Sequence, residues 1–337
     1  MDLAIVTISY NTRELLRACL ESVQASLDGA RALDAGVWVV DNASADGSAA
    51  MVREAFPAVR LMALADNLGF SGGNNLALRA LGFLPAGREL VRTGQLALPD
   101  DPNLLLAETP RHVLLLNSDT VVQGDALARL VAFMDETPRA GACGPQLAYA
   151  DGHFQHSAYR FPDLAQTTLD LFPPPGRLQA GLMDSRLNGR YPSGLVESNN
   201  PFAVDFVLGA SLMVRGRAIE QAGLLDEGYF MYCEEMDWQQ RLARNGWEVY
   251  CVPAARIVHH GAASTSQFRA TMFTVLWQSR LRYFARYHGA LYNRLLHRLI
   301  RAGMAAEARR ARAGAPPDLD ARLDAYAAVV RLAGGNQ

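Results

Sequence analysis

The chain has 337 residues, half of them hydrophobic and a fifth charged, a composition typical of a globular protein with one large domain or two smaller ones. Its formal net charge of −2 excludes a general electrostatic attraction to nucleic acid. The sequence has no signal-peptide pattern, no bilayer-spanning apolar run and no zinc-ligand spacing among Cys19, Cys143, Cys233 and Cys251, which favours a cytoplasmic protein with free thiols.

Four short apolar runs in the first half of the chain each end in polar, turn-forming residues. They predict buried strands at residues 3–9, 37–40, 60–63 and 113–116. Helical spacing of apolar residues predicts helices at 13–25, at 49–56, from the end of the polar loop 66–75 to about residue 81, and at 123–136. This alternation predicts an α/β fold with a Rossmann-like, mostly parallel central sheet and helices on both faces.

The pattern in the second half is less regular. Residues 82–110 and 161–202 are rich in proline and are predicted to be an insertion and an irregular loop, while Asp151-Gly152 predicts a hairpin. Strands are predicted at 142–148, 205–214, 247–252 and 256–258, with a short helix at 218–222 and a helix that begins near Glu234. Helical spacing after residue 268 predicts a C-terminal helical extension, which ends in one more helix within 316–337.

Strand-end residues provide the first indication of chemistry. Asp41, Asn67 and Asp119 are predicted to lie at the carboxyl edge of the sheet, where open α/β sheets bind ligands. A lone carboxylate there suits a hard divalent cation that also binds a substrate's phosphates, and His259 would bring an imidazole within reach of the same ion. The pattern therefore favours Mg²⁺ or Mn²⁺ holding a diphosphate.

Glu235 or Asp237, at the predicted helix start, could then deprotonate an attacking hydroxyl group. Each of these signals has a plainer interpretation. Asp119 could cap the helix 123–136, Glu234-Glu235 could be a solvated helix start, and His259-His260 could be ordinary histidines. Gly72-Gly73 matches neither a dinucleotide-binding nor a P-loop signature, which argues against NAD or P-loop chemistry.

Six motifs, taken together and in order, resemble those of the family 2 glycosyltransferases, in particular the bacterial rhamnosyltransferase-like branch. They are ISYN at 8–11, VVDNASADGS at 39–48, NLGFSGGNN at 67–75, LLLNSDT at 114–120, FMYCEEMDWQQRL at 230–242 and HHGAAST at 259–265. The resemblance covers about residues 3–290. It implies a GT-A fold, and an inverting, single-displacement transfer from a nucleotide sugar.

The resemblance also implies roles for individual residues. Asp119 and His259 match metal-binding positions, and Glu235 occupies the position of the base, a role that Asp237 could share. The family's DxD motif appears here as residues 117–119, with Asn117 in place of the first Asp, and Glu235 replaces the usual Asp of the Glu-Asp pair. The residues implied to bind the nucleotide sugar are Ser9, Tyr10, Asn11, Asp41 (against the base), Asn67, Gly69, Gly73, Asn74, Asn75, Asn117 and Ser118.

The expected organisation is a GT-A catalytic domain at 1–265, with a nucleotide-sugar-binding half at 1–120 and an acceptor half at 121–265, followed by a helical extension at 266–337. The expected reaction transfers L-rhamnose from dTDP-L-rhamnose to a bacterial surface glycan or a polyprenyl-diphosphate-linked acceptor. UDP-galactofuranose and UDP-hexoses fit the same motifs. A nucleotidyltransferase and a catalytically inactive homologue that serves as a binding subunit remain alternatives.

Residues 268–312 contain ten arginines and a single acidic residue, Glu307, with aromatic side chains between them. One interpretation is a helix pair that packs on the catalytic domain with solvated arginines. The other is peripheral attachment to the inner face of the cell membrane, because each basic residue near an anionic lipid surface contributes about 1 kcal/mol. The second interpretation suits a lipid-linked acceptor.

Overall fold

The structure, a computed structural model, describes residues 1–84, 104, 106, 108–176, 181–182, 185–261 and 269–335. Most of the predicted insertion at 82–110 lies outside the described residues. The predicted domain boundary between residues 265 and 266 lies outside them as well.

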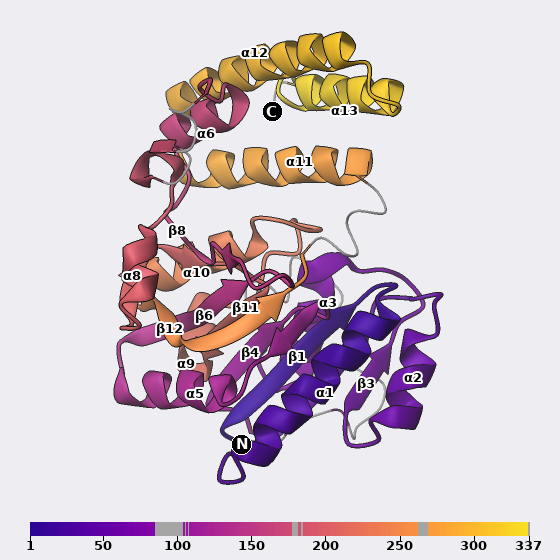
Figure 1. The fold of residues 1–337 in the computed structure, drawn as a ribbon, viewed down its shortest axis with the longest axis vertical. Helices are drawn as coiled ribbons and strands as arrows, with labels where there is room; N and C mark the ends of the chain where they lie inside the picture. The colour runs from indigo at the N-terminus through magenta and orange to yellow at the C-terminus, as the bar shows by residue number, and fades with distance from the viewer. Residues whose placement is uncertain are drawn as a thin grey trace.

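The first half of the sheet is parallel, as predicted. Its strands lie side by side in the order β3-β2-β1-β4, which places the first strand of the chain near the middle of the sheet (Figure 1). The strands are β1 (Leu3–Ser9), β2 (Ala35–Asp41), β3 (Arg60–Ala63) and β4 (His112–Leu116). The helices between them are α1 (Arg13–Gly29), α2 (Ser48–Ala55) and α3 (Gly69–Ala80).

The second half of the sheet is mixed. Strand β11 (Ser211–Arg215) lies antiparallel between β4 and β6 (Ala140–Ala148), and β12 (Glu248–His259) runs parallel to β6. The short strand β5 (Thr120–Val122) closes the far edge, antiparallel to β12. The predicted hairpin is present, because β7 (Phe154–Gln155) folds back on β6. The remaining short strands are β8 (Ala158–Tyr159), β9 (Phe202–Val204) and β10 (Phe206–Val207).

Several predicted boundaries are wrong. Residues 205–214 form two strands, β10 and β11, and residues 247–258 form a single strand, β12, with a shift of register between Val252 and Arg256. The three-residue strand β5 was not predicted, and the helix expected at 123 begins later as α5 (Ala126–Glu136). The loop expected at 161–202 contains α6 (Leu164–Leu171), a 3₁₀ turn η2 (Arg186–Asn188) and α8 (Ser193–Glu197).

Helix α3 also differs from its prediction, since it begins at Gly69 and not after Asn75. The cause is a local hydrogen bond, in which the Gly69 N–H donates to Asn67 Oδ1 at 2.9 Å and so satisfies one of the free N–H groups of the first turn. Asn67 therefore closes a local turn just before Leu68, the N-cap of α3, and sequence spacing does not reveal this turn.

Helices cover both faces of the sheet. Side chains of α1 and α5 pack against one face around Ile5 and Leu114, whereas α3, α9 (Gly216–Ala222) and α10 (Glu234–Arg244) pack against the other face around Val6 and Leu115. This alternation along β1 and β4 is the pleat of a doubly covered sheet. The four cysteines are buried and free.

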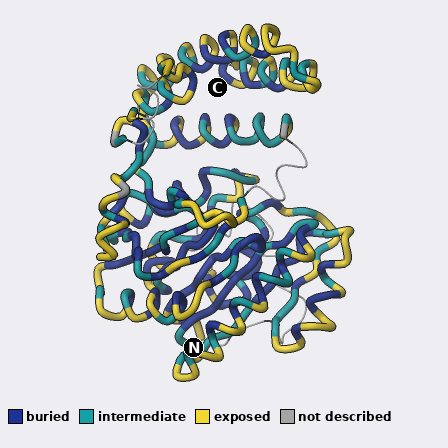
Figure 2. Tube along the Cα trace, in the orientation of Figure 1, coloured by how far each residue is buried: buried dark blue, intermediate teal, exposed yellow. Residues whose placement is uncertain are grey.

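A helical layer forms the C-terminal extension: α11 (Arg269–Tyr287), α12 (Ala290–Gly314) and α13 (Leu319–Leu332) (Figure 1). Together with Leu171 of α6 these helices build a second core, which also takes in Tyr229, Cys233 and Met236 at the start of α10. Figure 2 shows that the outward side of α12 is largely exposed. None of the helices in the described ranges combines the length and the apolar character needed to cross a bilayer.

Candidate active site

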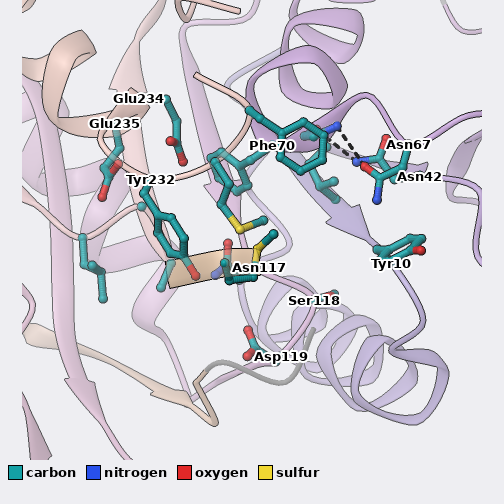
Figure 3. Close-up of a pocket in the computed structure, with 18 of the residues that line it drawn as sticks. Tyr10, Asn42, Asn67, Phe70, Asn117, Ser118, Asp119, Tyr232, Glu234 and Glu235 are labelled. Atoms are coloured by element: carbon teal, nitrogen blue, oxygen red, sulfur yellow. Dashed lines mark hydrogen bonds between the residues drawn. The ribbon is translucent and has the colours of Figure 1, made fainter. Parts of the chain in front are cut away.

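A cavity of about 330 Å³ lies at the carboxyl edge of the sheet, a volume within the usual range for small-molecule sites. Figure 3 shows Tyr10, Asn42 and Asn67 on one side of it, residues 117–119 along its floor, and Glu234 and Glu235 on the opposite side. Its lining is Ile8, Tyr10, Asn42, Asn67, Gly69, Phe70, Asn117, Ser118, Asp119, Leu208, Gly209, Ala210, Phe230, Met231, Tyr232, Glu234, Glu235, His259 and Met272.

The wall on the Asn42 side is built on a tight turn before α3. The Asn42 side chain donates to Gly69 O at 3.0 Å and accepts from Leu68 N at 3.3 Å, which joins the loop after β2 to the loop after β3. Gly69 has φ +72°, and a Cβ atom there would lie 2.4 Å from Phe230 O. Only glycine therefore lets this turn pack against Phe230, whose segment leads to α10.

Asp41, the predicted contact for the nucleotide base, ends β2 immediately before Asn42. Its side chain is 3% exposed and does not line the cavity itself. Asp41 Oδ2 accepts from Ser44 N at 3.1 Å, while Oδ1 has no hydrogen-bond partner among the described residues. A buried carboxylate oxygen without a partner is uncommon, and this one belongs to the residue next to Asn42 of the cavity wall.

Ser9 and Asn11, which were also predicted to bind the nucleotide sugar, do not line the cavity; their side chains contact neighbouring loops. The Ser9 hydroxyl lies 3.2 Å from the hydroxyl of Thr12, which in turn lies 2.9 Å from that of Ser118. Asn11 Oδ1 accepts from Ala45 N at 2.8 Å, so this side chain connects the loops after β1 and β2.

The predicted residues Gly73, Asn74 and Asn75 belong to α3 and also lie outside the cavity lining. The Asn74 side chain donates to Phe70 O at 2.9 Å. Asn75 makes two hydrogen bonds with the backbone of Leu225, at 2.9 and 3.0 Å, and so attaches α3 to the segment that precedes α10. The structure thus places these side chains where they support the cavity wall.

Asp119 and His259 come together at the edge of the sheet because β5 pairs with β12, which places His259 opposite Thr120. Both side chains are buried, and His259 Nε2 lies 3.4 Å from Asp119 Oδ1. On the other side of the ring, His259 Nδ1 lies 3.2 Å from Gln155 Oε1 of β7. The N-cap of α5 is Asp125, so Asp119 does not cap that helix.

The spacing of Asp119 and His259 fits one octahedral cation. Adjacent ligands at about 2.0–2.1 Å from Mg²⁺ stand roughly 3 Å apart, close to the separation seen here. A hydrogen on Nδ1 directed at Gln155 leaves the Nε2 lone pair for the ion. Among the described residues no group of three or more His, Cys, Asp and Glu side chains could hold a metal, so other positions would fall to diphosphate oxygens and water.

The carboxylates of Glu234 and Glu235 face the cavity from the first turn of α10 (Figure 3). Two consecutive residues with left-handed backbones, Tyr232 (φ 69°) and Cys233 (φ 67°), set the direction in which this helix begins. Burial raises the pKa of Glu235, while backbone N–H groups, including those of Met236 and Gly209, oppose the rise. Glu235 therefore presents to the cavity a carboxyl group whose pKa lies above its ordinary value.

Asp237, the alternative base, has a different environment. It is fully buried outside the cavity lining, where its carboxylate receives Arg241 Nε at 2.9 Å and the Tyr287 hydroxyl at 2.8 Å, with Arg286 Nη1 at 3.1 Å. A carboxylate neutralised by two guanidinium groups has no free oxygen for a substrate hydroxyl. Of these two acids, only Glu235 lines the cavity.

Sequence reasoning missed several contributors to the site, of which Asn42, Gln155 and Tyr232 are examples. Asn42 stands directly after a predicted strand, so its position was a usable signal. The sequence gives no signal for Gln155 or Tyr232. Gln155 contacts the site only through His259, and Tyr232 contributes through its left-handed backbone conformation.

The sequence of the chain matches a known protein family. The model of the family described as "Glycosyltransferase like family 2" matches residues 2–284 of the chain. The chain belongs to this family. It is accordingly a glycosyltransferase with a GT-A fold, and the match ends inside α11.

Curated relatives agree with this assignment. The chain is 29% identical over 309 residues, 90% of either chain, to the N-acetylglucosaminyl-diphospho-decaprenol L-rhamnosyltransferase of Mycobacterium tuberculosis. It is 25% identical over 178 residues, 52% of this chain and 62% of the relative, to the rhamnosyltransferase WbbL of Escherichia coli.

Solved structures share the fold at low identity. The mannosyltransferase PcManGT from Pyrobaculum calidifontis, in complex with GDP-Man and Mn²⁺, superposes with a TM-score of 0.52 at 15% identity, covering 99% of this chain and 86% of that one. GalNAc-T7 with UDP, GalNAc and Mn²⁺ gives a TM-score of 0.52 at 14% identity, covering 77% of this chain and 43% of that one.

Proposed function

We propose that this glycosyltransferase transfers L-rhamnose from dTDP-L-rhamnose to a hydroxyl group of a polyprenyl-diphosphate-linked sugar, with inversion and in a single displacement. The observation that carries the proposal is the cavity, in which the Asp119–His259 pair and the Glu235 carboxylate face one space. The identity of the sugar rests on the relatives, since two proteins named rhamnosyltransferases match the chain.

The donor would lie along the edge of the sheet. Asp41 Oδ1 would accept from the nucleotide base, while Tyr10, Asn67, Asn117 and the backbone around Gly69 would line nucleotide and sugar. Residues of α3 and of the loop after β1, which do not line the cavity, would support the cavity wall on the Asn42 side through their hydrogen bonds.

Asp119 and His259 would hold Mg²⁺ or Mn²⁺ against the donor diphosphate. The two structural neighbours described above have Mn²⁺ in their complexes, which supports this choice of ion. When bound, the ion supplies neutralisation of the charge that develops on the departing nucleoside diphosphate.

Glu235 would take the proton of the attacking hydroxyl as the new glycosidic bond forms. Holding donor and acceptor in line provides an entropic advantage of about 7–11 kcal/mol at best, and a general base adds roughly 10²–10⁴-fold in rate. A covalent intermediate is therefore not required. Asp237 would keep α10 in place and take no part in proton transfer.

The acceptor proposal also bears on membrane association. Three arginines of α11 form ion pairs with other parts of the protein. Arg280 pairs with Asp170, Arg282 with Asp226, and Arg286 with both Asp226 and Asp237. Of the exposed arginines of α12, Arg310 pairs with Glu307, whereas five others take part in none of the ion pairs found in the described ranges: Arg294, Arg298, Arg301, Arg309 and Arg312. We therefore narrow the proposed membrane-binding segment from 268–312 to the outward face of α12.

The decisive experiment is a thermal-shift series with dTDP, UDP and GDP, with and without Mn²⁺, and CMP as control. A ligand that binds only the folded state raises the melting temperature by mass action. We expect a Mn²⁺-dependent rise with dTDP that Asp119→Ala abolishes. A shift with UDP alone would keep the reaction class and discard dTDP-rhamnose. The absence of any nucleotide-induced shift would contradict the proposed function.

A further inference from the structure

Glu234 is a buried acid for which the mechanism above has no use. Its side chain is 5% exposed and lines the cavity beside Glu235. Its Oε2 atom has no hydrogen-bond partner within the described part of the chain. Burial of an unpartnered carboxyl group is costly, so such groups are uncommon unless a ligand completes them.

The local backbone explains why Glu234 faces the cavity. The left-handed residues Tyr232 and Cys233 start α10 abruptly, and both acids of its first turn then reach the same space (Figure 3). Asp237, also near the start of α10, provides a comparison. It is equally buried, but it is neutralised by Arg241 and Arg286. Asp237 is thus paired with two cations, whereas Glu234 has no ion pair among the described residues.

The surroundings of Glu234 favour its neutral, protonated form. Burial raises its pKa well above the ordinary value, and the neighbouring charge of Glu235 raises it further. Of the two acids, Glu235 has the larger set of stabilising backbone N–H groups, so it ionises first. Burial also raises the pKa of the Cys233 thiol, and Arg280 of α11, whose charge opposes that rise, is paired with Asp170 at 3.0 Å.

A neutral carboxyl group offers one hydrogen-bond donor and one acceptor, a combination that suits neighbouring oxygens of a sugar ring. A second ionised carboxylate beside Glu235 would instead repel it and compete for the same proton. Glu234 lies on the side of the cavity opposite Asn42, next to Glu235 (Figure 3). Because Glu235 is the proposed base for the acceptor hydroxyl, the acceptor sugar would bind on this side.

We propose that Glu234 is an acceptor-binding residue that acts as an un-ionised acid, donating its O–H to an acceptor-sugar oxygen next to the hydroxyl that Glu235 deprotonates. This inference rests on the proposed function. The proton of the attacking hydroxyl passes to Glu235, and Glu234 keeps its own proton throughout.

Steady-state kinetics with separately varied donor and acceptor test the role. An amide reproduces the hydrogen-bonding capacity of a neutral acid, so Glu234→Gln should keep kcat and the acceptor KM within about 3-fold. Glu234→Leu should raise the acceptor KM roughly 10-fold to 100-fold and leave the donor KM unchanged. Glu235→Gln should lose turnover, and Glu21→Gln, on the exposed side of α1, should change nothing.

Two outcomes would overturn the assignment. Loss of turnover in Glu234→Gln equal to that in Glu235→Gln would show that Glu234 works ionised. A change in donor KM alone in Glu234→Leu would place the residue against the donor. Folding is not expected to obscure either result, because both variants remove a buried acid that lacks a partner, and a melting curve checks this.

Infrared spectroscopy separates this inference from the proposed function, because it needs no substrate. A protonated-carboxyl band should be present in the wild-type protein at neutral pH, persist in Glu235→Gln and disappear in Glu234→Gln. Its absence from the wild type would refute the neutral acid even in an active enzyme. Its presence, in a protein that binds no nucleotide, would refute only the proposed function.

Discussion

At the scale of single residues, Gln155 shows how a side chain without chemistry of its own can shape a site. It lies 3.2 Å from His259 Nδ1 on the side of the ring away from Asp119. Partners of this kind fix the ring orientation and tautomer of a ligating histidine, and their loss typically weakens metal binding 10–100-fold. The hairpin β6–β7 therefore contributes to the site through one hydrogen bond.

The prediction is that Gln155→Leu weakens Mn²⁺ binding by about 10-fold or more, measured by electron paramagnetic resonance titration in the presence of dTDP. Gln155→Glu should retain binding, because a carboxylate also accepts from Nδ1–H. Equal Mn²⁺ affinity in the leucine variant and the wild type would show that Gln155 does not orient the histidine.

A second residue-scale prediction concerns pH. Burial raises the pKa of Glu235, the proposed base, above its ordinary value of 4.5, so on acidification it takes up a proton at a higher pH than an exposed carboxylate does. The profile of kcat against pH should therefore fall through an acid limb set by this raised pKa. The limb should persist in Glu234→Gln. An acid limb at the ordinary carboxyl pKa would be inconsistent with Glu235 as the base.

The sequence could predict some residues of the site and not others, for a physical reason. Asp119 and His259 were predictable because strand ends gather at one edge, and the β5–β12 pairing indeed brings them together. Glu235 and Asp237 could not be told apart, since both are acids at a helix start. Their difference depends on the backbone turn at Tyr232 and on the two arginines that bind Asp237, Arg241 of the same helix and Arg286 of α11.

At the scale of elements, α11 packs against the cavity and against the segment that leads into α10. Its residue Met272 lines the cavity, and its Ser279 hydroxyl donates to Met231 O at 2.8 Å. Arg282 and Arg286 pair with Asp226, at the start of the segment that leads into α10. The family match, which ends at residue 284, includes almost all of α11. We infer that α11 fixes the segment that carries both glutamates.

This inference predicts the effect of Asp237→Asn. Breaking a buried ion pair by removing one partner typically costs about 3–5 kcal/mol, here because Arg241 and Arg286 lose their shared carboxylate. The variant should unfold at lower denaturant concentration and lose turnover, yet still bind nucleotide, whose proposed contacts lie on the first half of the chain. Asp28→Asn on the exposed side of α1 is the control. Unchanged stability would contradict the structural role of Asp237.

Element prediction from sequence succeeded for β1 to β4 because each is an apolar run closed by polar residues. It failed where a strand is very short or bends around the site. Strand β5 has three residues, and the strand expected at 205–214 is interrupted at Leu208, Gly209 and Ala210, which line the cavity. Tertiary packing, and not local pattern, determines those segments.

At the scale of the whole molecule, charge is distributed unevenly although the net charge is close to zero. Five exposed arginines of α12, at 294, 298, 301, 309 and 312, lie together on the outward side of the helical layer, beside exposed Leu291 and Leu295. A helix face of this composition suits the headgroup region of an anionic bilayer.

We predict that the protein sediments with phosphatidylglycerol vesicles and not with phosphatidylcholine vesicles. At about 1 kcal/mol for each basic residue, the combined changes Arg294→Glu, Arg298→Glu and Arg301→Glu should weaken that binding by roughly 100-fold or more. The same reversal at Arg31, Arg53 and Arg217, which are exposed on the catalytic domain, should have little effect. If both triple variants lost vesicle binding equally, the binding would depend on overall charge and not on the outward face of α12.

The order of strands in the sheet has a consequence for how the protein is made. Strand β11 lies between β4 and β6, so a growing chain exposes open edges on both of those strands until residue 215 has left the ribosome. Open edges are where chains aggregate. His259 is synthesised later still, in the strand that positions it beside Asp119. The nascent chain therefore makes the strands of the Asn42 wall first, and it can pair β4 with β11 and bring His259 beside Asp119 only after residues 215 and 259 have been made.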